Sequence, residues 1–189
     1  MKDPNSQARE SDNSELKKIR GLLSKQGVEL STDSNLASLT SRGFGTPEKN
    51  KLTLNVFETL FLQSKGILEV QKGKRLRALD FQQLLHRFAL LDKSVWAKYL
   101  VYRDLRSRGY VVREGFGLGI DFRVYERGEY GKATATYLIL EIQEGKPISV
   151  EKLARVLKHV QSLKKKLVLA VVNRRGEIVY YTLSKLTMK

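Results

Sequence analysis

The sequence predicts an α+β protein with two domains, and three observations support that prediction. Hydrophobic residues recur at helical spacing in some segments and in short strand-like runs in others. The chain has 189 residues, and its 41% hydrophobic and 29% charged content is typical of a globular protein. The pattern becomes more regular near residue 91. We therefore expect a small N-terminal α+β domain over residues 14–91 and a second domain over residues 92–189.

The first thirteen residues are expected to form a disordered tail. Residues 1–13 are polar and contain few apolar side chains. Ordering them would bury little surface against the cost in conformational entropy.

Helices and one strand are predicted in the N-terminal part. Hydrophobic residues at helical spacing predict three helices, over residues 14–24, 52–65 and 81–91. Gly21 is unfavourable within the first helix, Gly66 is expected to end the second, and Asp80 is expected to cap the third. Residues 67–70 are predicted to form a short strand, followed by a basic hairpin or loop over residues 72–77.

The C-terminal part alternates more clearly between helices and strands. Two helices are predicted, over residues 92–108 and 149–164. Five strands are predicted, over residues 110–113, 119–125, 136–142, 167–172 and 177–183. The buried side of the first helix is expected to consist of Val95, Trp96, Tyr99, Leu100 and Tyr102. The order αβββαββ predicts a mixed sheet with helices packed against it.

The net charge favours a polyanionic partner. The chain carries 35 Lys and Arg residues against 20 Asp and Glu residues, which gives a formal charge of +15. The positive excess is present in both predicted domains, and neutralising phosphates with such a surface releases counterions. Nucleic acid is therefore the first candidate partner, and a solvated basic face is the alternative.

The composition also restricts the cellular compartment and the kinds of catalytic or metal site that we expect. No run approaches the roughly 20 apolar residues that cross a bilayer, and the N-terminus lacks the pattern of a secretory signal. We expect a cytoplasmic protein without a membrane partner. The absence of Cys excludes disulfides, thiolate metal sites and cysteine nucleophiles.

A metal-dependent nuclease site is one alternative. Asp121 followed by Glu141 and Gln143 is similar to the acid and acid-x-Lys pattern by which many nucleases hold Mg²⁺, with glutamine at the lysine position. The two histidines, His86 and His159, lie on predicted helices, where solvated or partly packed side chains are the simpler interpretation.

Five segments of the second half together resemble the C-terminal domain of archaeal tRNA-splicing endonucleases. They are residues 99–112, 119–128, 137–140, 162–172 and 176–181. The first half is similar to the N-terminal domain of the same family through Gly43-Phe-Gly45 and the predicted helix that ends at Gly66. The resemblance implies a C-terminal nuclease-like α/β domain with a mixed sheet flanked by helices.

The resemblance also implies a chemistry. The family excises introns from precursor tRNA without a metal or other cofactor, through a Tyr, a His and a Lys, and leaves 2′,3′-cyclic phosphate and 5′-hydroxyl ends. Tyr125 and Lys165 match the family's tyrosine and lysine, whereas Thr134 stands at the position of the histidine. A threonine hydroxyl is a poor proton donor near neutral pH. The resemblance therefore implies a catalytically incomplete, structural subunit.

Partners and contact residues are implied in the same way. The expected partners are a catalytic paralogue, in a heterotetramer with two copies of each chain, and precursor tRNA with a bulge-helix-bulge motif. The implied RNA-binding residues are Arg127, Lys158, Lys164, Lys165 and Lys166. The implied interface residues are Glu144, Ile178, Val179, Tyr180 and Tyr181. Lys158 stands where the family uses an arginine to sandwich a bulge base, and lysine lacks the planar group for stacking.

Two further alternatives remain besides the metal nuclease. One is an active homomeric, metal-independent RNase of the same family, in which His159 or solvent supplies the proton. The other is a nucleic-acid-binding module that forms no enzymatic assembly.

Overall fold

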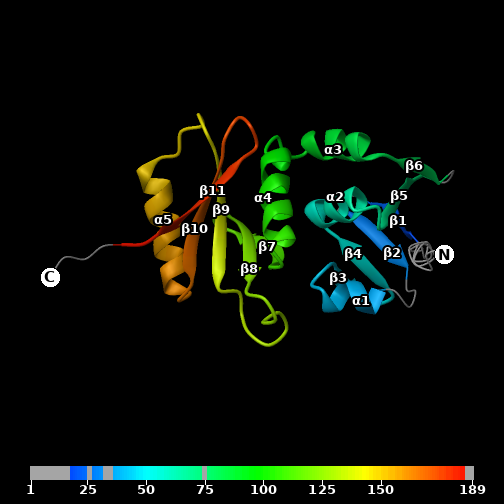
Figure 1. Ribbon diagram of the computed structural model, residues 1–189, viewed down its shortest axis with the longest axis horizontal. Coiled ribbons are helices and arrows are strands. Elements are labelled where there is room, and N and C mark those ends of the chain that lie inside the picture. Colours follow the sequence, from blue (N-terminus) through cyan, green and yellow to red (C-terminus); the bar gives the residue numbers. More distant parts are fainter. Residues whose placement is uncertain (1–17, 25–26, 32–35, 74–75, 186–189) are drawn as a thin grey trace, which may run out of the picture.

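The computed structural model describes residues 18–24, 27–31, 36–73 and 76–185, which form two sheets with helices between and beside them (Figure 1). The predicted tail over residues 1–13 lies outside this part of the chain. None of the helices in it is long and apolar enough to cross a membrane. The fold is α+β, as predicted.

The N-terminal half contains a six-stranded mixed sheet in the order β3-β4-β2-β1-β5-β6. Its elements are β1 (Ile19–Leu23), β2 (Val28–Ser31), α1 (Leu36–Ser41), β3 (Thr46–Glu48), β4 (Lys51–Leu54), α2 (Val56–Ser64), β5 (Leu68–Lys72), β6 (Arg77–Leu79) and α3 (Phe81–Ala89). Strand β1 runs antiparallel to β2 and parallel to β5. The predicted strand over residues 67–70 and the basic hairpin after it correspond to β5 and β6.

The prediction of a helix over residues 14–24 is wrong for residues 18–24, which are the part of that range that the structure describes. Residues 19–23 form β1 in the interior of the sheet. A Cβ at Gly21 would overlap the side chains of Val28 and Leu30 on β2. Glycine is therefore needed for close approach to the neighbouring strand, a requirement that helical spacing does not reveal.

The helix predicted over residues 52–65 begins later than expected. Residues 51–54 belong to β4, and α2 begins after Asn55. The Asn55 side chain accepts a hydrogen bond from the Glu58 amide, and the Glu58 side chain accepts one from the Asn55 amide, which forms a capping box. A similar box between Asp80 and Gln83 begins α3, so the predicted cap at Asp80 is confirmed. Strands β2 and β3 and helix α1 were not predicted.

The C-terminal half contains a five-stranded mixed sheet in the order β11-β10-β9-β8-β7. Its elements are α4 (Val95–Ser107), β7 (Val111–Gly117), β8 (Ile120–Tyr125), β9 (Tyr137–Gln143), α5 (Val150–Ser162), β10 (Lys166–Val172) and β11 (Ile178–Leu183). All seven predicted elements are present. Helix α5 connects the parallel strands β9 and β10, and α4 and α5 lie on opposite sides of the sheet (Figure 1). Of the residues expected to be buried on α4, only Trp96 is substantially exposed.

One hydrophobic core continues from the N-terminal sheet through α4 to the C-terminal sheet. Helix α4 stands between the two halves (Figure 1). The ring of Phe57 on α2 packs edge-on against Phe122 on β8, with centroids 5.0 Å apart, and both rings contact Tyr102 on α4. These aromatic contacts join the halves through buried surface.

A buried ion pair fixes the junction. The Arg113 guanidinium on β7 donates to Glu58 Oε1 at 2.8 Å, to the Gly43 carbonyl oxygen at 3.2 Å and to Thr46 Oγ1 at 2.9 Å. The Glu58 side chain is only 1% exposed. Burial raises the pKa of the Glu58 carboxyl, and Arg113 together with backbone N–H donors opposes that rise. One C-terminal cation thus holds three groups of the N-terminal half.

Replacing Arg113 should destabilise the whole chain. In Arg113→Met the Glu58 carboxyl stays buried without its cation, so the free energy of unfolding in urea should fall by about 3–5 kcal/mol. Lys51→Met is the matched control, because the pair between Lys51 and Glu29 is exposed and should contribute little. Equal losses in the two variants would contradict a specific role for the buried pair.

Candidate active site

The candidate site lies at one edge of the C-terminal sheet, where three strand ends meet. Strand β8 is antiparallel to β9, and β9 is parallel to β10. The register pairs Val124 with Tyr137 and Tyr137 with Lys166. The end of β8 therefore meets the starts of β9 and β10, together with the loop over residues 126–136 (Figure 1, bottom).

Lys165 reaches this edge because of the way α5 ends. Lys164 has a φ of 55°, which turns the chain after the helix, and the Lys165 amide donates to the Val160 carbonyl oxygen at 3.1 Å. The Lys166 amide then donates to the Thr136 carbonyl oxygen at 3.2 Å and begins β10. This positions Lys165 Nζ to donate a hydrogen bond to Thr134 Oγ1 at 2.5 Å.

Tyr125 ends β8 on the same edge. Its ring is partly exposed and lies perpendicular to the ring of Tyr130, with centroids 5.1 Å apart. The Thr136 amide donates to the Val124 carbonyl oxygen at 3.0 Å, which closes the loop beside Tyr125. Sequence positions 125, 134 and 165 are thus brought to one edge of the sheet by its topology.

Basic side chains surround this edge. Lys164, Lys166 and Arg127 are exposed near the strand ends, and Lys158 is exposed on α5. The Lys166 ammonium lies 5.7 Å from the ring centroid of Tyr137, and the Arg127 guanidinium lies 5.8 Å from that of Tyr110.

Beside the edge, a cleft of about 210 Å³ opens between α4 and the sheet. It is lined by Leu105, Arg108, Tyr110, Val124, Tyr137, Ile139, Val168 and Tyr180. Tyr110 and Tyr137, whose rings lie near the Arg127 guanidinium and the Lys166 ammonium, thus also line this aromatic and apolar cleft.

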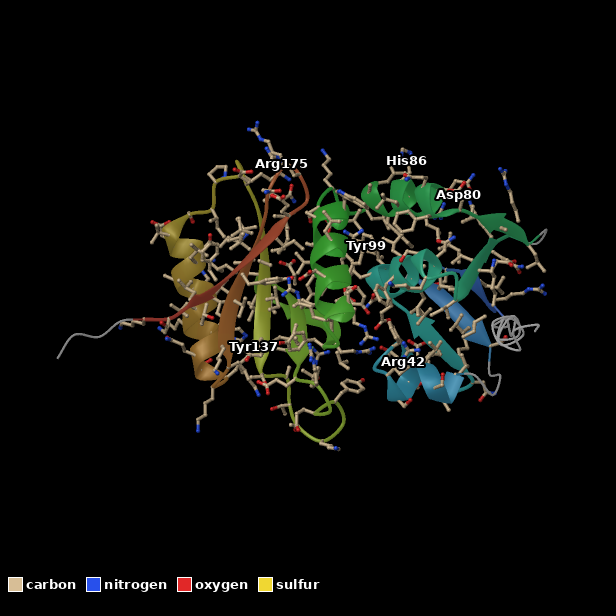
Figure 2. All side chains as sticks on the ribbon, in the orientation of Figure 1. Arg42, Asp80, His86, Tyr99, Tyr137 and Arg175 are labelled. Carbon is tan, nitrogen blue, oxygen red and sulfur yellow. The ribbon has the colours of Figure 1, made fainter. Side chains whose placement is uncertain are left out.

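Neither histidine side chain makes a hydrogen bond or ion pair with these residues in the described part of the chain. His86 is exposed on α3, on the other side of α4 from Tyr137 (Figure 2). The Nε2 atom of His159 is buried and makes no hydrogen bond within the described chain. His159 therefore makes no polar contact with Lys165 or Thr134.

The implied interface residues on β11 divide between two faces. Strand β11 is an edge strand whose one partner in the described chain is β10. Tyr180 points inward, and its hydroxyl donates to Asp104 Oδ2 on α4 at 2.7 Å. Burial, followed by this hydrogen bond, raises the pKa of Tyr180. Ile178 is partly buried, whereas Val179 and Tyr181 are 51% and 55% exposed.

Glu144 lies at the other end of the sheet from Lys165. Its amide donates to the Val172 carbonyl oxygen at 2.9 Å, where β9 and β10 end. Its carboxylate is exposed and accepts a hydrogen bond from the Arg174 amide at 3.3 Å. The loop that contains Glu144 therefore projects from the edge opposite to the candidate site.

Of the two carboxylates considered for a metal, that of Asp121 is engaged with other groups. Asp121 Oδ1 pairs with Lys98 Nζ at 3.1 Å, and Asp121 Oδ2 accepts from the Glu141 amide at 2.7 Å. Lys98 also pairs with Asp92 Oδ2 at 2.9 Å. These contacts connect the start of α4 to the sheet. The Lys98 ammonium therefore neutralises the Asp121 charge that a bound metal ion would otherwise neutralise.

The fold and the site together define a class of protein. A mixed sheet with helices on both sides, and with a lysine and a tyrosine at one basic edge, is the architecture of a nuclease-like α/β domain. Comparisons with known sequences agree. The family described as "tRNA intron endonuclease, catalytic C-terminal domain" matches residues 95–180, and "tRNA intron endonuclease, N-terminal domain" matches residues 19–85.

Named relatives support the same family. The tRNA-splicing endonuclease of Methanococcus vannielii is 31% identical over 172 residues, which is 91% of this chain and 97% of the relative. That of Thermococcus kodakarensis is 32% identical over 153 residues, 80% of this chain and 89% of the relative. That of Pyrococcus furiosus is 34% identical over 141 residues, 75% and 80% of the two chains. The chain belongs to the tRNA-intron endonuclease family.

Glu141 gives a pH-dependent prediction. Burial, followed by the nearby Asp121 carboxylate, raises the pKa of Glu141 in the folded chain, and its Oε1 makes no hydrogen bond within the described residues. Folding therefore becomes less favourable as the pH rises above the ordinary carboxyl pKa of about 4.3. The stability of Glu141→Gln relative to the native chain should increase between about pH 4 and pH 7, as measured by urea unfolding.

The exposed position Glu129 supplies the control for this measurement. Glu129→Gln removes a carboxylate from a solvent-exposed turn, so its stability difference from the native chain should change little over the same range. A flat profile for Glu141→Gln would contradict a cost of burying the Glu141 charge.

Proposed function

We propose that this chain is the structural, catalytically incomplete subunit of a tRNA-splicing endonuclease that excises introns from precursor tRNA. The contact between Lys165 and Thr134 is the observation that carries the proposal. The family's histidine position is filled by a threonine, and that threonine accepts a hydrogen bond from the lysine that remains.

The chemistry explains why this contact is informative. Cleavage to a 2′,3′-cyclic phosphate needs a base for the 2′-hydroxyl proton, an acid for the departing 5′-oxygen and a cation for charge on the phosphorane. Lys165 is placed to act as a cation, and Tyr125 lies on the same edge. Imidazole titrates near neutral pH, whereas the hydroxyl of Thr134 does not. At this edge Lys165 could therefore stabilise the charge on the phosphorane, but none of the described groups there is an efficient proton donor.

The proposed assembly contains two copies of this chain and two of a catalytic paralogue. The exposed side of β11, with Val179 and Tyr181, would extend the sheet toward another subunit. The loop with Glu144 projects from the end of the sheet opposite to Lys165 and would offer a carboxylate to a basic pocket of the partner. Arg127, Lys158 and the lysines at 164–166 would contact the phosphates of precursor tRNA in the cytoplasm.

Restoring the histidine should restore cleavage. The chain is incubated in EDTA with an RNA that contains a bulge-helix-bulge motif, and products are resolved on gels. Thr134→His should cleave about 10²- to 10⁴-fold faster than the native chain, because the lost acid-base group typically contributes that factor. Products should carry 2′,3′-cyclic phosphate and 5′-hydroxyl ends.

Two controls accompany this gain of function. Thr134→Ala should stay at the native rate, and Lys165→Ala in the Thr134→His background should remove the gain. Rapid cleavage by the native chain alone would instead favour an active homomeric RNase. Strict dependence on Mg²⁺ would favour the metal nuclease.

Co-expression tests the assembly directly. Co-purification with a paralogue that contains the complete triad should yield a complex of two plus two chains, as measured by multi-angle light scattering. Cleavage by that complex should be unaffected by Tyr125→Phe in this chain, because the proposed site here lacks its proton donor. Failure to form a complex, with no gain in cleavage, would favour the binding module.

A further inference from the structure

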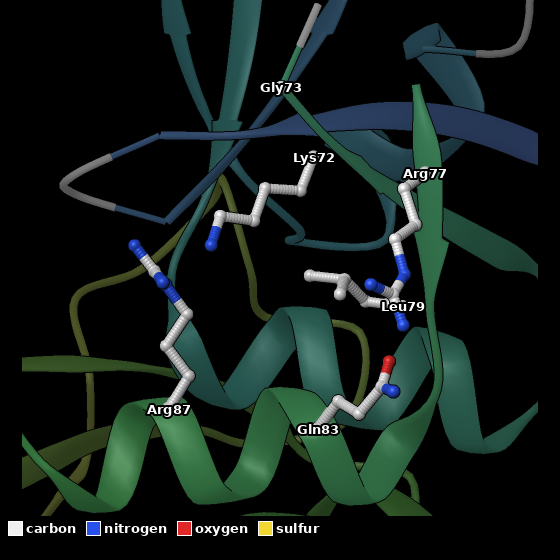
Figure 3. Close-up of a pocket in the computed structure, with 6 residues that line it drawn as sticks. All are labelled: Lys72, Gly73, Arg77, Leu79, Gln83 and Arg87. Carbon is white, nitrogen blue, oxygen red and sulfur yellow. The ribbon is translucent and has the colours of Figure 1, made fainter. Parts of the chain in front are cut away.

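A second basic feature lies in the N-terminal half, in a cleft of about 420 Å³ between the β5–β6 hairpin and α3. It is lined by Lys72, Gly73, Arg77, Leu79, Gln83 and Arg87. Figure 3 shows Lys72 from β5 and Arg87 from α3 reaching toward one another, while Arg77 from β6 lies beside Leu79 above Gln83. Three cations from three elements therefore converge on one hollow.

These cations have no anionic partner in the described part of the chain. None of them takes part in an ion pair there, although five such pairs form elsewhere. The acidic residues on and next to these elements are Glu69 and Asp80. Glu69 accepts a hydrogen bond from Gln71, and Asp80 caps α3 through the Gln83 amide. Gathering like charges without a counterion is unfavourable unless a ligand supplies negative charge.

We propose that this cleft binds phosphate groups of the RNA backbone, as a second contact apart from the cleavage edge. The inference rests on the proposed function in one respect, namely that the chain engages precursor tRNA. Strongly charged polyanions suit such a cleft, because each neutralised phosphate releases counterions.

The lining side chains specify the kind of contact. The guanidinium groups of Arg77 and Arg87 can each donate two parallel hydrogen bonds to phosphate oxygens, and Lys72 adds a point charge. The Gln83 amide can bond a phosphate or a ribose 2′-hydroxyl. Leu79 provides an apolar surface for the sugar. Contacts of this kind position the RNA without reading its sequence.

The cleft lies away from the cleavage edge. Strand β6 and helix α3 are at the upper right of Figure 1, whereas the loop over residues 126–136 is at the bottom of the C-terminal half. One chain thus offers phosphate contacts on two faces. The phosphates bound in the cleft therefore differ from those at the candidate site.

The test measures RNA affinity of the full-length chain as a function of salt. Fluorescence anisotropy with a labelled bulge-helix-bulge RNA gives the slope of log K against log salt. Lys72→Gln/Arg77→Gln/Arg87→Gln should make this slope shallower by about 2 to 3. The loss of affinity between about 50 and 200 mM salt should then be roughly 20- to 60-fold smaller than for the native chain.

A matched control removes the same charge from elsewhere. Lys18→Gln/Lys93→Gln/Lys185→Gln neutralises three exposed lysines outside the cleft and also lowers the net charge by three. Its slope should stay within about 1 of the native value. Circular dichroism checks that each variant folds. If the triple variant does not fold, Arg87→Gln is compared with Lys93→Gln, and Arg87→Gln should change the slope by about 1 and by more than Lys93→Gln does.

Each outcome supports or overturns the proposal. A larger change for the cleft variant than for the control supports it. Equal changes overturn it and leave the proposed function intact, whereas no RNA binding by the native chain, alone or with its paralogue, overturns both. If the cleft variant keeps native RNA binding but loses binding to phosphatidylserine vesicles, the cleft serves a lipid surface and the proposal is wrong.

Discussion

The ion pair between Arg113 and Glu58 sets the relation between the two halves of the molecule. Arg113 belongs to β7, the edge strand beside β8, and Glu58 belongs to the first turn of α2. Arg113 also donates hydrogen bonds to the Gly43 carbonyl oxygen and to Thr46. Because β8 ends at Tyr125, the same strand pair that meets the N-terminal half also positions the candidate site. Any tilt at the junction would therefore change the orientation of the two basic surfaces relative to each other.

The candidate site depends on strand register more than on local sequence. Thr134 and Lys165 are 31 positions apart, and they touch because β9 and β10 start side by side. The topology of the sheet thus places Thr134 beside Lys165, and under the proposed function Thr134 lacks the acidity that the reaction requires. The proposed role in assembly and RNA positioning needs the surface of the domain and does not need a proton donor.

Sequence reasoning succeeded where local rules and tertiary structure agree. Helix α3 begins at the predicted cap Asp80, and α5 begins after Ser149, whose hydroxyl accepts from the Lys152 amide. It failed at β1, where leucine spacing also fits a helix and only pairing with β2 and β5 selects a strand. It missed the start of α2, although Asn55 and Glu58 carry the capping pattern. The cleft lined by Lys72, Arg77 and Arg87 could not be predicted from the sequence, because it forms only where the β5–β6 hairpin packs beside α3.

The parallel pairing of β1 with β5 also has a consequence for synthesis on the ribosome. Ile19 pairs with Leu68, so the N-terminal sheet cannot be completed until that much of the polypeptide has emerged. Arg113, the partner of Glu58, lies 55 positions after Glu58 in the sequence and is translated after all the strands of the N-terminal sheet. Until Arg113 has been synthesised, the nascent N-terminal half has the Glu58 carboxylate on a surface that is buried in the complete protein. Glu58 gains its ion-pair partner only when the C-terminal sheet folds against that surface.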